Sequence, residues 1–161
     1  MRRCMLILAM ISFWIPIHVL GGEVDSMIQL HVHCHNGKPC RFTGETIAVE
    51  LELVNGGEKD VALPLEYFRK QGPKVILVDN HSYKERRLGM GPPMTSLFNR
   101  MEVLASGQSI RIPWSIPGHH VSRFALRPVS ITVIFRFYLA PGTAQSTKDF
   151  VSTQLLVEDG R

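Results

Sequence analysis

The chain has 161 residues, a formal net charge of +4 at pH 7 and 45% hydrophobic residues. This length is typical of one domain that buries a single core. A charge excess this small gives no reason to expect a nucleic-acid partner.

Residues 1–22 have the pattern of a secretory signal peptide. An arginine pair precedes an apolar run at residues 5–20, and two glycines follow it. We expect cleavage after one of these glycines, which leaves residues 23–161 as one domain of a secreted or periplasmic protein with no membrane span. The alternative is an uncleaved membrane anchor, because the run is only slightly shorter than the roughly 17 to 25 residues that cross a bilayer.

Two runs within residues 27–55 alternate apolar and polar side chains. The apolar positions are Ile28, Leu30, Val32 and Cys34 in the first run, and Ile47, Val49, Leu51 and Leu53 in the second. A period of two is typical of β-strands with one buried and one wet face. We expect the two strands to pair as an antiparallel hairpin through residues 36–44.

The wet face of these two strands is a candidate metal site. Antiparallel pairing would bring three histidines beside two carboxylates: His31, His33, His35, Glu50 and Glu52. Alternate residues of a strand are about 6.5 to 7 Å apart, so two imidazoles and one glutamate would suit a zinc or copper ion. The alternative is a set of ordinary cross-strand pairs with no metal.

Cys34 and Cys40 are the two cysteines that remain after residue 22. In an oxidising compartment, such a pair indicates a disulfide that closes a short loop. The alternative is a pair of thiolates that ligate a metal.

Further strand candidates follow, separated by turn signals rich in Pro, Gly and Asn. They lie at 60–65, 74–79, 101–104, 110–116, 129–138 and 151–157. Pro113 cannot donate to a ladder, so its strand belongs at a sheet edge or carries a bulge. No segment has a sustained helical period. Seven or eight short strands with such turns predict an all-β fold, an immunoglobulin-like antiparallel β-sandwich.

The segment 81–100 has no regular pattern and is a candidate interaction loop. Long loops of compact domains are often functional, and methionines offer an adaptable contact surface. The alternative is a solvated excursion between two strands. The candidate contact residues are Lys84, Arg86, Arg87, Met90 and Met94, with His119 and His120 from a turn in which we expect both rings to be exposed.

Three segments carry a resemblance to a known family. They are FTGETIAVELELVNGG at 42–57, GPKVILVD at 72–79 and VLASGQSIRIPWSIP at 103–117. This layout resembles bacterial secreted immunoglobulin-like domains and is similar to the BsuPI-type proteinase-inhibitor fold. The resemblance covers about half of residues 23–161 and implies a β-sandwich. No reactive motif is matched, so it assigns no inhibitory residue.

No motif of an enzyme is found. The chain has no Gly-x-Ser-x-Gly elbow, His-Glu-x-x-His pair or phosphate loop. We therefore expect a secreted or periplasmic, non-catalytic binding module with a protein partner and no cofactor. The alternatives are an extracytoplasmic copper- or zinc-binding protein and a protease inhibitor.

Overall fold

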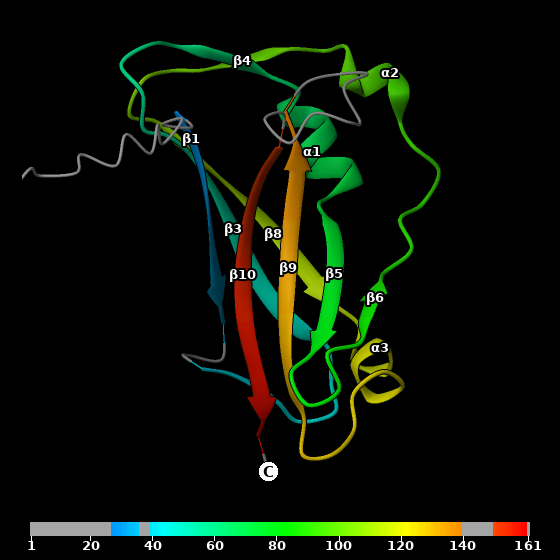
Figure 1. The fold of residues 1–161 in the computed structure, drawn as a ribbon. Coiled ribbons are helices and arrows are strands. Elements are labelled where there is room, and N and C mark those ends of the chain that lie inside the picture. Colours follow the sequence, from blue (N-terminus) through cyan, green and yellow to red (C-terminus); the bar gives the residue numbers. More distant parts are fainter. Residues whose placement is uncertain (1–26, 36–38, 140–149, 161) are drawn as a thin grey trace, which may run out of the picture.

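The computed structural model describes residues 27–35, 39–139 and 150–160 (Figure 1). These residues form a strand-rich fold with three sheets and three short helices. The two larger sheets lie as layers, with β5, β9 and β10 in front of β3 and β8 in the view of Figure 1. The prediction of an all-β chain is thus confirmed at the level of class.

The three-stranded sheet contains the two alternating runs found in the sequence. Its order is β1 (Ile28–Cys34), β3 (Ile47–Asn55), β8 (Ser109–Ile116), and both pairs are antiparallel. Burial alternates along all nine residues of β3, as the period of two predicts. Pro113 lies in β8, at an edge of this sheet, which confirms its predicted place.

The five-stranded sheet has the order β2 (Cys40–Phe42), β10 (Phe150–Asp159), β9 (Ser130–Tyr138), β5 (Lys74–Asp79), β6 (Glu85–Arg87). The β2–β10 pair is parallel and the other three pairs are antiparallel, so the expectation of purely antiparallel pairing is wrong at this position.

The predicted hairpin is correct in its pairing and wrong in its connection. Leu30 lies opposite Leu53 in an antiparallel β1–β3 pair, as expected. The chain between the two strands, however, crosses to the other sheet and adds β2 there. A third, small sheet pairs β4 (Val61–Leu63) with β7 (Glu102–Leu104).

Three helices were not expected from the sequence. They are α1 (Leu65–Gln71), α2 (Thr95–Phe98) and α3 (Gly118–Ser122). With seven residues or fewer, each is too short for a 3.6-residue period to repeat, so the hydrophobic pattern gives no clear signal. Helix α1 is fixed by Phe68, which is fully buried with its ring 4.7 Å from that of Phe137 on β9.

The inner faces of the two larger sheets share one hydrophobic core. Leu51 and Leu53 of β3 belong to the same cluster of buried residues as Phe135 and Phe137 of β9. All four side chains are at most 2% exposed. Burial at this depth is worth about 1.5 to 3 kcal/mol for each large apolar side chain, so the contact between the layers dominates the stability of the fold.

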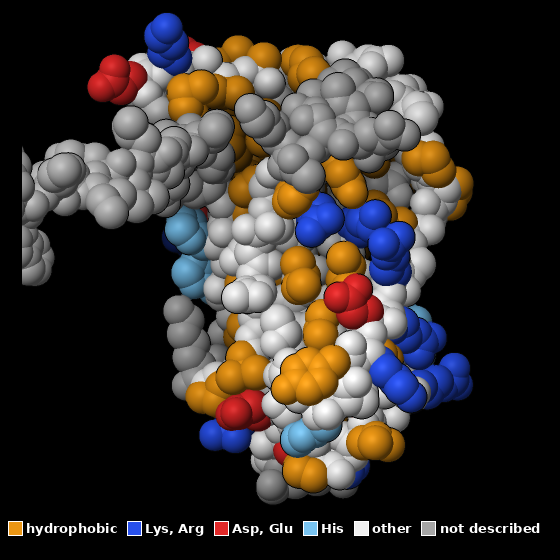
Figure 2. Space-filling view, in the orientation of Figure 1, with side chains coloured by type: hydrophobic (Ala, Val, Ile, Leu, Met, Phe, Trp, Pro, Cys, Tyr) orange, Lys and Arg blue, Asp and Glu red, His pale blue; other side chains and the backbone are white. Residues whose placement is uncertain are grey.

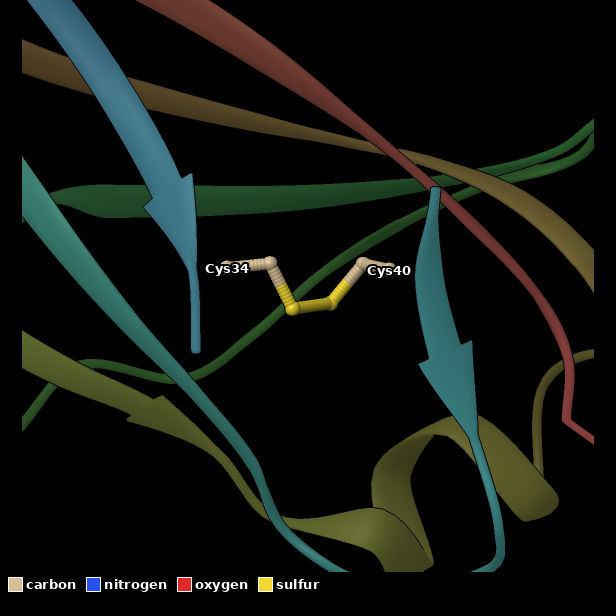
Figure 3. Close-up of a disulfide and its surroundings, with 2 residues drawn as sticks. All are labelled: Cys34 and Cys40. Atoms are coloured by element: carbon tan, nitrogen blue, oxygen red, sulfur yellow. A yellow bond between two sulfur atoms is a disulfide. The ribbon is translucent and has the colours of Figure 1, made fainter. Parts of the chain in front are cut away.

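A disulfide joins the two layers at one end of the core. Cys34 belongs to β1 of the three-stranded sheet and Cys40 to β2 of the five-stranded sheet, with their Cα atoms 5.7 Å apart (Figure 3). The predicted bridge is confirmed, and it also links two sheets. A disulfide is compatible with an extracytoplasmic location.

The predicted signal peptide lies outside the described residues. Among the described residues, no helix has the length and apolar character needed to cross a membrane.

Removing the bridge tests its contribution to stability. The Cys34→Ala/Cys40→Ala variant should lose about 2 to 3 kcal/mol of unfolding free energy, because the unfolded chain regains the entropy of a short open loop. Urea titration measures the loss. Reductant should destabilise the wild type by a similar amount and leave the variant unchanged; equal stability of both oxidised proteins would contradict this role.

Candidate binding site

The predicted metal residues of β1 and β3 lie on the outer face of the three-stranded sheet, where antiparallel pairing places histidines beside glutamates, as expected. His31 faces Glu52, and His33 faces Glu50. His35 follows the end of β1 and is exposed. In the part of the chain that the structure describes, no group of three His, Cys, Asp or Glu side chains is placed to hold a metal ion. Zinc or copper binding by this face stays a prediction.

The two glutamates of this face already have partners within the chain. Glu52 accepts a hydrogen bond of 2.9 Å from the Ser109 hydroxyl and lies 3.6 Å from His33 Nε2. Arg111 lies 3.6 Å from Glu50 and 3.7 Å from Glu52. The Ser109 hydrogen bond, with the charges of Arg111 and His33, outweighs burial and lowers the pKa of Glu52. The arrangement matches ordinary cross-strand pairing.

The structure brings the predicted interaction loop and the histidine pair together at one pocket. The pocket has a volume of about 220 Å³ and opens between the chain that follows β6 and helix α3. Its walls include Pro73, Val75, Leu88, Met90, Trp114 and His120. Met90 and His120 were both candidate contact residues, and they now share a cavity lined mainly by apolar side chains.

Gln71 holds the loop side of the pocket in place. This side chain, 8% exposed at the end of α1, donates a hydrogen bond to the Gly91 carbonyl (3.3 Å) and accepts one from the Met94 amide (3.0 Å). The loop is therefore tied to the fold at two backbone positions. Met90 and Met94 remain 42% and 44% exposed, as expected of a contact surface.

Trp114 forms another wall of the pocket, and its indole ring lies against Gly72. Gly72 has a φ of +75°, and a Cβ at this position would overlap the indole ring. Glycine is favoured here for two reasons. Other L-residues rarely adopt a positive φ, and the indole ring leaves no room for a Cβ atom. The sequence predicted residues 110–116 only as a strand and assigned no contact role to Gly72, so neither Trp114 nor Gly72 was among the predicted contact residues.

His120 has an unusual environment at the first turn of α3. Its Nδ1 atom is buried and has no hydrogen-bond partner in the structure. Burial, followed by the charges of His119, Arg86 and Arg123, lowers the pKa of His120, so the ring is neutral at pH 7. The expectation that both rings are exposed is correct for His119 and wrong for His120, which is half-buried.

Strand β6 forms the outer edge of the five-stranded sheet next to this pocket. The Leu88 amide bonds to Val75 and the Lys84 carbonyl to Asp79, both on the β5 side. Because bonding direction alternates along an antiparallel strand, the backbone groups of Glu85 and Arg87 point away from β5. In the described ranges no strand pairs with that outer side.

Cationic side chains surround this open edge. Lys84, Arg86 and Arg87, all predicted contact residues, are exposed and form no ion pair with any described residue. Figure 2 shows Lys and Arg side chains gathered along the β5 and β6 side of the molecule. The edge therefore offers unpaired hydrogen-bonding groups, positive charge and an apolar pocket in one place.

Comparison with known protein families finds no match, and a search of curated proteins finds none. Among solved structures, the sporulation control protein Spo0M from Bacillus subtilis is similar, with 12% sequence identity and a TM-score of 0.46. The similarity covers 82% of this chain and 49% of that protein, so the chain spans about half of its length. We assign neither fold nor function from so distant a likeness.

Two glycines with positive φ allow the effect of the steric clash to be separated from that of backbone strain. Gly72→Ala should destabilise the protein by about 2 to 4 kcal/mol, since it combines positive-φ strain with a clash against Trp114. Gly107 has a φ of +71° and open space around it, so Gly107→Ala should cost only about 1 kcal/mol. Urea titration compares them, and equal losses would contradict the packing described.

The partly buried imidazole of His120 predicts a pH dependence of stability. The pKa of His120 is lower in the folded chain than in the unfolded chain, where it is about 6.5. The unfolded state therefore binds more protons as pH falls, and stability is lost as the pH falls from about 7.5 through and below 6.5. Unfolding free energies across this range should fall less steeply for His120→Gln than for wild type, whereas His119→Gln should retain most of the slope. An unchanged slope in His120→Gln would refute the assignment.

Proposed function

We propose that the chain is an extracytoplasmic, non-catalytic binding module with an immunoglobulin-like β-sandwich fold. Two layers over one core and a disulfide between them support this proposal. We further propose that the module recognises an extended, acidic segment of a protein partner at the open edge of β6. The observation that carries this proposal is that the unpaired edge of β6, three cations without ion pairs among the described residues, and the apolar pocket lie next to one another.

The backbone of β6 provides the first element of recognition. The amide and carbonyl groups of Glu85 and Arg87 face outward, so an incoming strand would add to the sheet through main-chain hydrogen bonds. Edge strands that are left open in this way readily accept another chain. Because main-chain bonds are independent of sequence, specificity must come from the side chains around the edge.

Charge provides the second element and favours an acidic partner. Lys84, Arg86 and Arg87 stand against one acid, Glu85, on this strand and its first flanking residue. Pairing of two β6 edges would bring like charges together, which disfavours self-association. An acidic segment has the complementary charge, and electrostatic attraction would increase its rate of association.

The pocket provides the third element. Leu88 and Met90 follow β6 directly, so a side chain of a strand added to β6 would lie next to the cavity that they line. Trp114 offers an aromatic surface to an apolar residue of the partner, and the His120 ring forms part of the same pocket wall. Protease inhibition, the other alternative from the sequence, stays a prediction.

Selection from random linear peptides tests this function. The disulfide-intact chain is used as bait, and we expect the enriched peptides to combine acidic residues with one apolar residue. Arg86→Glu/Arg87→Glu should weaken their binding by at least about tenfold, because the complementary charge is reversed. Lys59→Glu reverses an exposed charge far from β6 in sequence and should retain full affinity. Enrichment without acidic residues, or equal loss in both variants, would overturn the proposal.

The binding mode has a separate test on the peptide. If the peptide adds as a strand, N-methylation of every second amide removes donors to β6 and abolishes binding, whereas methylation of the intervening amides leaves those bonds intact. Calorimetric titration of both methylated peptides distinguishes the two patterns. Equal effects of the two patterns would contradict strand addition.

A further inference from the structure

A second cationic site lies on the outer face of the five-stranded sheet. Lys74 of β5 and Arg136 of β9 are direct cross-strand partners. Tyr138, two residues further along β9, shares the same face. This face is the one toward the viewer in Figure 2, where Lys and Arg side chains gather over β5 and β9.

The pairing of Lys74 with Arg136 is electrostatically unfavourable as it stands. Like charges directly opposite on neighbouring strands repel each other. Neither side chain forms an ion pair with any described residue, although both are half-buried. Partial burial weakens solvent screening, so a bound anion between them would relieve the repulsion.

Aromatic contacts hold both cations in place. The Arg136 guanidinium lies 4.1 Å from the centre of the Phe150 ring, and its buried Nε has no hydrogen-bond partner in the structure. The Lys74 ammonium donates a hydrogen bond of 3.4 Å to the Tyr138 hydroxyl. Stacking of this kind fixes the guanidinium plane and leaves its donors directed elsewhere.

A pocket of about 260 Å³ is built around these groups. Lys74, Arg136 and Tyr138 line it together with Tyr67, Gly72 and Met90. The polar groups thus come from the sheet, whereas Tyr67 and Met90 add apolar surface. Met90 also lines the pocket beside His120, so one methionine borders both cavities.

The ionisation of Tyr138 reflects the positive potential of this pocket. Burial acts to raise the pKa of Tyr138, but the hydrogen bonds and charges of Lys74 and Arg136 outweigh it, and the pKa lies below its usual value. An environment that favours phenolate also favours other oxyanions.

We propose that Lys74, Arg136 and Tyr138 form a binding site for the oxyanion group of a small organic ligand, a carboxylate or a phosphate ester. Arginine provides a planar donor pair for such a group, lysine a point charge and tyrosine a hydroxyl donor. The remainder of the ligand packs against Tyr67 and Met90. This proposal does not depend on recognition at β6, although Met90 borders both pockets.

Titration of the full, disulfide-intact chain with phenyl phosphate, benzoate and inorganic phosphate tests the site. We expect saturable binding, with the two aromatic anions tighter than inorganic phosphate because their rings bury apolar surface in the pocket. Arg136→Gln and, separately, Lys74→Gln should each weaken binding by at least about tenfold. Lys59→Gln, at an exposed position outside the pocket lining, should change the affinity by less than about twofold.

Two further readouts make the result specific. Phenyl phosphate should raise the pKa of Tyr138, seen in the ultraviolet titration of phenolate and lost in Tyr138→Phe. Vesicles of phosphatidylcholine with phosphatidic acid separate a lipid headgroup from a soluble ligand, and we expect no sedimentation with them. Absence of saturable binding, equal affinity of wild type and a folded Arg136→Gln variant, or binding to vesicles alone would overturn the proposal.

Discussion

The contact between the inner faces of β3 and β9 is the constraint on which the rest of the structure depends. Each strand buries every second residue in the same core, so a shift by one position would turn the whole apolar face outward. Once these two registers are set, the outward positions are determined as well. The pairing of His33 with Glu52, and of Lys74 with Arg136, therefore follows from the demands of the core.

The two wet faces created in this way differ in how their charges are balanced. On the three-stranded sheet, Arg111 and Ser109 neutralise and hydrogen-bond the glutamates within the chain. On the five-stranded sheet, the cations of β5, β6 and β9 have no acidic partner among the described residues. Charge that a fold leaves unbalanced is available to a ligand, and both proposed sites lie on that side of the molecule.

The sequence predicted those parts of the structure that depend on local pattern. Strand 74–79 was bounded correctly and the buried faces of β1 and β3 were assigned, because such patterns are encoded in neighbouring residues. The connection through β2 was missed, since three residues carry too little pattern to show which sheet they join. Lys74 and Arg136 are 62 positions apart in the sequence, and only the register of two paired strands shows that they are neighbours.

Gln71 affects recognition although it lies behind the binding surface. Its two hydrogen bonds to the backbone at Gly91 and Met94 fix the conformation of the loop when the chain folds. The conformational entropy of this loop is therefore lost during folding and not during association. A surface that is ordered beforehand discriminates between partners by shape, because it cannot adapt to each of them. The buried side-chain amide of Gln71 thus orders the loop that carries Met90 and Met94 before any partner binds.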